Sequence, residues 1–165
     1  MDKHKPVSLY RFFWFWKLQF FVEKTMLSLN LGTSVLRIEH VGSTSIRGMP
    51  AKPIVDISIA VDDYEQVFWM VKVLERLGYS YLGENSDLRE YAFERTGLLA
   101  SKLFICEPDG EKWQARIHFR NYLRNHPMER QVYAALKKDL AQQHKDDLLS
   151  YQRAKLPFVQ EILLK

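Results

Sequence analysis

The chain has 165 residues, of which 47% are hydrophobic, and this length favours one domain with a single core. Lysine and arginine total 24 against 20 acidic residues, so the formal charge of +4 is compatible with an anionic ligand without indicating a nucleic-acid-binding protein. The lone Cys106 excludes an internal disulfide and any metal site built from several cysteines. A single cysteine is typical of proteins in the reducing cytoplasm, so we expect a cytoplasmic protein. We interpret Cys106 as a packing residue.

The predicted elements begin with a helix over residues 8–30 that is rich in aromatic side chains. Its most apolar part, residues 12–22, is about half as long as a membrane-spanning helix and is interrupted by Lys17 and Gln19. No small-residue cleavage site follows, so we expect neither a membrane span nor a signal peptide. We interpret the segment as an amphipathic helix packed on the domain, with a membrane-surface helix, a partner-binding helix or a homo-oligomer interface as alternatives.

The middle of the chain is rich in predicted strands. We expect these strands, the last two joined as a hairpin, over residues 35–41, 54–61, 79–82, 90–95 and 99–106. The run at 54–61 is nearly all apolar, which indicates a central strand buried on both faces. Between the second and third strands, Asp63 offers an N-cap and Gly78 an end for a helix with a regular apolar stripe.

Helices are expected again in the last third of the chain. The pattern predicts one over about 111–124, one that starts at His126-Pro127, and one over 146–164 that kinks or splits at Pro157. Residues 1–165 are therefore predicted to form one α+β domain, with a core over about 30–125 and C-terminal helices over about 127–164. Its expected architecture is one mixed sheet flanked by N-terminal and C-terminal helices.

The most informative stretch is a polar turn between the first two predicted strands. Gly42 tolerates the backbone angles of a tight turn, in which backbone amides can approach a phosphate closely. Hydroxyls and cations follow it, and we expect them to bind a phosphate together with Gly42: Ser43, Thr44, Ser45, Arg47 and Lys52. A plain polar connection between strands is the alternative.

Asp56 follows this turn within an apolar strand. An acid among apolar neighbours is costly to bury unless a cation pairs with it, here a metal ion, Lys52 or an arginine. We interpret Asp56 as a ligand of Mg²⁺, with a structural ion pair as the alternative. Phosphoryl chemistry with two metals needs several carboxylates at one point, yet the next position on the same strand face is Ser58. One Mg²⁺, shared with the ligand's phosphates, is therefore the most that we expect.

Two motifs and a closing pattern resemble the GrpB family (UPF0157), and the likeness runs from about residue 10 to the C-terminus. The first motif comprises Glu39 to Ser45, Gly48 and Ala51 to Ile57, and the second comprises Phe119 to Pro127. The closing pattern consists of Tyr133, Leu136, Lys137, Leu140, Tyr151, Lys155 and Phe158. The resemblance implies a nucleotidyltransferase-like fold, with the Gly-Ser turn at the nucleotide phosphates and acids at the metal. It assigns Gly42, Ser43, Lys52 and Asp56 to this site, with Ser43 and Asp56 as the catalytic candidates.

The sequence departs from the family pattern at several polar positions. Arg47 stands where proline is usual, Ser58 where a second acid often appears, and Asn121 where an aspartate is usual. The strand at 102–105 has no histidine in the place of the family's His-x-His strand. The loss of several metal-binding or proton-transfer groups argues against catalysis.

Further basic residues lie outside the turn. Arg89 resembles a frequent family arginine, and we count it among the candidate phosphate ligands, with pairing to a neighbouring acid as the alternative. Arg116, Arg120 and Arg124 are spaced by four, which puts them on one helical face. That face is either solvated or a rim that attracts a phosphate-bearing partner. No RNA-recognition module is present, so nucleic acid is not an expected partner.

Three functions remain open. The first is binding of a nucleotide or another phosphate-bearing small molecule, with transfer of a nucleotidyl group assisted by one Mg²⁺. The second, favoured by the missing groups, is a catalytically inactive ligand-binding or protein-interaction module on the same fold. The third is a pocket recruited for different chemistry on a phosphate-free substrate, redefined by Lys102 and Asn121. The first function requires Asp56 and Ser43 to face each other.

Overall fold

The computed structural model describes residues 6–165, apart from the side chains at positions 66 and 88. A five-stranded mixed sheet with the order β1-β2-β5-β4-β3 confirms the predicted α+β class. Its strands are β1 (Val35–Val41), β2 (Val55–Val61), β3 (Ser80–Asn85), β4 (Glu90–Arg95) and β5 (Ser101–Cys106). β2 and β5 are parallel, and the other neighbours are antiparallel, so the predicted β4–β5 hairpin is confirmed.

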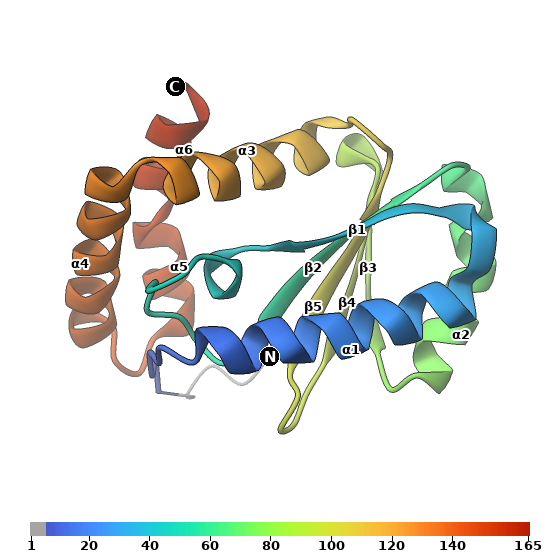
Figure 1. The fold of residues 1–165 in the computed structure, drawn as a ribbon, viewed down its shortest axis with the longest axis horizontal. Coiled ribbons are helices and arrows are strands. Elements are labelled where there is room, and N and C mark those ends of the chain that lie inside the picture. Colours follow the sequence, from blue (N-terminus) through green and yellow to red (C-terminus); the bar gives the residue numbers. More distant parts are fainter. Residues whose placement is uncertain (1–5) are drawn as a thin grey trace.

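Helices lie on both sides of the sheet and beyond one end of it (Figure 1). They are α1 (Phe13–Leu31), α2 (Val67–Arg76), α3 (Glu111–Asn125), α4 (Pro127–Gln143), α5 (Leu148–Ala154) and α6 (Leu156–Leu163). Figure 1 shows α1 along one side of the sheet and α3 along the other, with α4 and α5 standing next to the turn that follows β1. The predicted break near Pro157 is confirmed, because Pro157 lies in the first turn of α6.

The two faces of the central strand β2 meet different surroundings. Ile57 and Ile59 belong to the main hydrophobic core, which the sheet forms with α1 and α2. Because side chains alternate along a strand, Asp56 and Ser58 share the opposite face with Ala60, which packs with α3. This second face is therefore the one that can present polar groups to a ligand.

The first helix begins later than the sequence pattern predicts. Residues 8–12 lie outside α1, and the backbone of Tyr10 forms a bridge with that of Ala51, with N···O distances of 2.8 and 2.9 Å. This non-local pairing competes with helix formation and holds the N-terminal segment against the loop before β2. From Phe13 onward the helix packs on the domain as expected, with Trp16 and Leu27 in the core. Within residues 6–165, no helix combines the length and the apolar character needed to cross a membrane.

Cys106 is buried against Trp113, as its interpretation as a packing residue requires. Burial raises the pKa of its thiol to about 11, so the thiolate that would react as a nucleophile is scarce near neutral pH.

Candidate functional site

The polar turn after β1 is held by its own hydrogen bonds. Gly42 has a φ of 67°, in the left-handed region that favours glycine. The hydroxyl of Ser45 donates to the Gly42 carbonyl at 2.7 Å, and the Thr44 hydroxyl lies 2.9 Å from Nε2 of His40. Burial lowers the pKa of His40 to about 3, so its ring is neutral and has a structural role in the turn.

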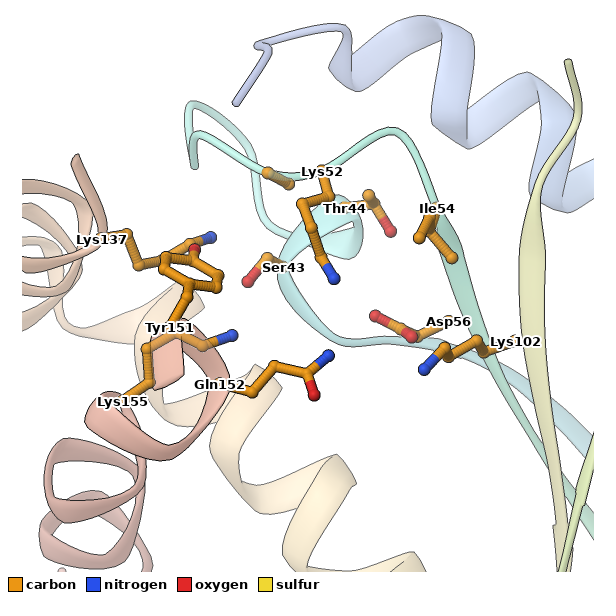
Figure 2. A pocket seen from close by; sticks show the side chains of 11 residues that line it. Ser43, Thr44, Lys52, Ile54, Asp56, Lys102, Lys137, Tyr151, Gln152 and Lys155 are labelled. Atoms are coloured by element: carbon orange, nitrogen blue, oxygen red, sulfur yellow. The ribbon is translucent and has the colours of Figure 1, made fainter. Parts of the chain in front are cut away.

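Asp56 faces this turn. Val41, the residue before Gly42, lies opposite Asp56 in the antiparallel pairing of β1 and β2. A Cβ atom at Gly42 would lie 2.2 Å from Oδ2 of Asp56, so the carboxylate occupies the space that any larger residue would need. Ser43 and Asp56 consequently line the same cavity, as the first of the three functions requires (Figure 2).

This cavity has a volume of about 140 Å³ and is rich in lysine. Its four lysines come from the loop before β2, from β5, from α4 and from the junction of α5 and α6: Lys52, Lys102, Lys137 and Lys155. Figure 2 shows the ammonium groups of Lys52, Lys102 and Lys155 directed toward the space in front of Asp56. Segments far apart in the sequence therefore bring their positive charges to one point.

The packing of the helices positions these lysines. The side chain of Lys137 is 2% exposed, donates a hydrogen bond to the Pro50 carbonyl and lies 5.3 Å from the ring centroid of Tyr133. Lys155 lies 4.4 Å from the ring centroid of Tyr151. Within the described residues, none of the four lysines lies within ion-pair distance of a carboxylate. Their charges are thus only partly compensated.

Burial and mutual repulsion lower the pKa values of three of these lysines. Burial and the nearby Lys155 lower the pKa of Lys137 to about 7. Burial and the nearby Lys52 lower the pKa of Lys155 to about 8, and the pKa of Lys52 is also lowered, first by burial and then by Lys102. Burial raises the pKa of Asp56, and Lys102 and Lys52 partly offset that rise. A bound anion would favour the protonated form of every lysine in the cavity.

The donor set of the cavity fits an anion better than a metal ion. In the part of the chain that the structure describes, no three His, Cys, Asp or Glu side chains are grouped so that they could hold a metal. Asp56 is the one acid among the residues that line the cavity, and the neighbouring ammonium groups repel a cation. Mg²⁺ at Asp56 would need the ligand's phosphates for its remaining coordination, so this cofactor stays a prediction of the sequence.

Ser58, where a second acid could have stood, does not line the cavity. Its side chain is fully buried, and its Oγ has no hydrogen-bond partner among the described residues. In the register of the sheet, Ser58 lies between Glu39 of β1 and Phe104 of β5. A carboxylate at this position would therefore be buried beneath α3, at a high desolvation cost.

We expect Ser58→Ala to be neutral or to raise the free energy of unfolding by up to about 1 kcal/mol, because it removes a desolvated hydroxyl that has no partner. Urea denaturation of the wild type and the variant measures the difference. A loss of more than about 1 kcal/mol would show that the hydroxyl has a partner in solution.

Four of the predicted phosphate ligands are not among the residues that line the cavity: Gly42, Ser45, Arg47 and Arg89. Ser45 is buried, and its carbonyl accepts a hydrogen bond from Arg124 at 2.8 Å. Arg47 lines a separate groove next to α1 and α3. Arg89 pairs with Glu107 at 2.7 Å, close to the start of α3, which is the alternative of pairing with an acid, and it does not line the cavity.

The arginines of α3 hold the helix on the polar face of the sheet. Arg120 is 8% exposed and pairs with Glu39 at 2.6 Å, while Arg116 pairs with Glu90 and lies 4.0 Å from the ring centroid of Phe104. The interpretation of this face as solvated is therefore wrong for Arg116 and Arg120, whereas Arg124 is exposed. Arginine suits position 116 because its guanidinium can pair with a carboxylate and stack on an aromatic ring at the same time.

Sequence reasoning did not assign Lys137, Gln152 and Lys155 to the site, although Lys137 and Lys155 belong to the closing pattern of the family; all three line the cavity. A signal for Lys137 was present, because it follows Tyr133 by four residues and precedes Leu140 by three. That spacing places Lys137 on the apolar face of its helix, where burying its charge costs free energy. A role in a functional site explains why a lysine stands there.

Comparisons with known proteins agree with this fold. The family model described as GrpB protein matches residues 6–165. The glutamate-rich protein GrpB of Alkalihalophilus pseudofirmus is 36% identical over 154 residues, 90% of this chain and 88% of that protein. The UPF0157 protein YqkA of Bacillus subtilis is 36% identical over 141 residues, and the match spans 85% of this chain but 41% of that protein. The crystal structure of the conserved protein GrpB from Enterococcus faecalis matches with a TM-score of 0.86 and 32% identity, over 95% of this chain and 94% of that one.

Proposed function

Since this chain belongs to the GrpB family and carries a lysine-rich cavity at its Gly-Ser turn, we propose that the cavity binds the phosphate of a nucleotide or of another phosphate-bearing small molecule. The observation that carries the proposal is the convergence of Lys52, Lys102 and Lys155 on the space in front of Asp56, with the buried Lys137 in the wall of the same cavity. Partly buried positive charges without ion-pair partners are unfavourable, and an anion in the cavity would supply the missing negative charge.

Each part of the cavity has a role in this proposal. Lys52 and Lys155 would neutralise the phosphate, and Ser43 would donate its hydroxyl hydrogen bond to a phosphate oxygen. Asp56 would limit the repulsion between the lysines when no ligand is bound, and its carboxylate fills the space beside Gly42.

Binding is the function that this geometry supports best. Nucleotidyl transfer with two metals needs several carboxylates, and the residues that line the cavity include one. Transfer assisted by a single Mg²⁺ at Asp56 would make ligand binding depend on the metal. Binding through the lysines would not, and this difference can be measured.

We expect pyrophosphate, ATP, GTP, CTP or UTP to raise the melting temperature, and to do so equally with Mg²⁺ or with EDTA. At about 100 times its Kd, a ligand stabilises the native state by about 2.7 kcal/mol. For a chain of this size, that corresponds to a rise of roughly 5–11 °C. Differential scanning fluorimetry in a buffer without phosphate measures the shift.

Two lysine variants provide the controls for this experiment. Lys155→Ala should reduce the rise, whereas Lys138→Ala, which removes an exposed lysine of α4, should leave it unchanged. A rise that requires Mg²⁺ and disappears in Asp56→Ala would contradict binding by the lysines and support metal-assisted chemistry. If none of the five ligands raises the melting temperature, phosphate binding at this cavity is excluded.

A further inference from the structure

A second cavity, of about 350 Å³, adjoins the lysine-rich one. Lys52, Ile54 and Lys102 line both cavities. From these shared residues, the second cavity extends along the connection between β4 and β5, and residues of the N-terminal segment before α1 form another part of its wall. A ligand held by the lysines could therefore extend from one cavity into the other.

The two cavities differ in their chemistry. The surface of the second is mostly apolar, and Tyr10, Pro53 and Leu148 contribute ring and aliphatic groups to it. The other charged residues that line it are Glu94 and Arg95, and Arg95 is already paired with Glu23 at 2.7 Å. The positive charges without an ion-pair partner therefore belong to the lysines of the first cavity. This arrangement suits a ligand that has an anionic group attached to an uncharged organic part.

The walls of the second cavity are held in place by backbone hydrogen bonds. Tyr10 pairs with Ala51, and the amide of Val7 donates to the carbonyl of Lys145 at 2.8 Å. On the opposite wall, the carbonyl of Ala100 accepts from the amide of Val55 at 3.0 Å. A cavity whose walls are fixed without a ligand is typical of a small-molecule site.

We propose that the second cavity holds the uncharged organic part of the same ligand, so that the ligand class is a nucleotide and not an inorganic or short alkyl phosphate. This inference rests on the proposed function. The first cavity, at about 140 Å³, has room for a phosphate-sized group, whereas the second reaches the range of about 300–1,000 Å³ in which small organic ligands bind. Tyr10, 40% exposed and stacked on Phe12 with 5.3 Å between the ring centroids, lines this cavity, and an aromatic ring is a surface on which a nucleobase can stack.

Calorimetric titration with ADP and with pyrophosphate separates the two parts of the ligand, because ADP carries its two phosphates on an organic body. We expect the wild type to bind ADP at least about 10-fold more tightly than pyrophosphate, the equivalent of about 1.4 kcal/mol. Titrations at one pH and one ionic strength, without Mg²⁺, keep the charge of the lysines constant.

Ala100→Phe is the variant that tests the second cavity. Ala100 lines the cavity and its carbonyl is held by the amide of Val55, so we expect the larger side chain to occupy part of the cavity. It should lower the affinity for ADP to that for pyrophosphate and leave pyrophosphate binding unchanged. Leu98→Phe is the matched control, because Leu98 is 90% exposed in the same connection and does not line the cavity. Should Ala100→Phe not fold, Tyr10→Ala should still weaken ADP binding alone.

The outcomes distinguish this inference from the proposal on which it rests. Equal affinities of the wild type for ADP and pyrophosphate would overturn the assignment of the second cavity and leave phosphate binding intact. An unchanged preference for ADP in Ala100→Phe, with the variant folded, would overturn it as well. Binding of neither ligand would remove both proposals.

Discussion

Gly42→Ala should lower the free energy of unfolding by about 2–5 kcal/mol, because it combines backbone strain, about 1–2 kcal/mol, with overpacking, about 1–3 kcal/mol. The added methyl group would meet Oδ2 of Asp56 at 2.2 Å, and the φ of 67° disfavours any residue with a Cβ. Either the turn or the carboxylate has to move, so we also expect the affinity for pyrophosphate to fall. Urea denaturation and calorimetry measure the two effects.

Gly48→Ala is the matched control for this substitution. Gly48 also has a positive φ, of 79°, but a Cβ there would meet no atom within 4 Å. Its expected cost is the strain alone, about 1–2 kcal/mol, with pyrophosphate binding unchanged. Equal losses in the two variants would mean that the contact with Asp56 does not matter, and that the turn is positioned by other interactions.

Lys137→Met should remove much of the pH dependence of stability between pH 7 and pH 9. The pKa of Lys137 is about 7 in the folded protein and 10.5 as the ordinary value. In this window the unfolded chain binds the proton that the folded protein has released, so stability rises with pH, by roughly 1.4 kcal/mol per pH unit for one group. Lys155, with a pKa of about 8, adds to the rise in its upper half.

The rise in stability ends near pH 10, because lysines in the unfolded chain lose their protons there. Tyrosines also begin to ionise in the unfolded chain while the buried ones stay protonated, which lowers stability. Burial raises the pKa of Tyr151 to about 12, so its contribution to stability decreases once unfolded tyrosine ionises. Urea denaturation from pH 7 to pH 9, without phosphate, compares the wild type, Lys137→Met and the exposed control Lys138→Met. Parallel slopes for all three proteins would show that Lys137 is not the group responsible.

The turn and Asp56 could be predicted from the sequence because short-range spacing determines them. A strand, a glycine that permits a left-handed turn and a second apolar strand place Gly42 beside Asp56 almost without tertiary information. The family resemblance pointed to the same residues. The alternation along β2 likewise fixed which face would carry the carboxylate.

Lys137 and Lys155 could not be placed from the sequence, because tertiary packing brings them to the turn. Tyr133 of α4 packs with Ile46 and Met49 of the loop, and this contact between distant segments carries Lys137 to the cavity. The predicted start of the first helix, at residue 8, is wrong for the same reason, because the backbone bridge between Tyr10 and Ala51 outweighs the local apolar pattern. Arg89 shows the reverse. Its place in the sequence matches the family, but it precedes the end of β4 that pairs with Cys106, whereas Asp56 pairs with Lys102 near the other end of β5.

The residues of the cavity come from separate elements, and this affects how its ligand preference can change. The sheet and turn supply the carboxylate, whereas α4 and the junction after α5 supply Lys137 and Lys155. Exchanging these two side chains for acids would invert the electrostatic sign of the site with the strands untouched. The same scaffold could thus select cations or anions according to a pair of positions in its final helices.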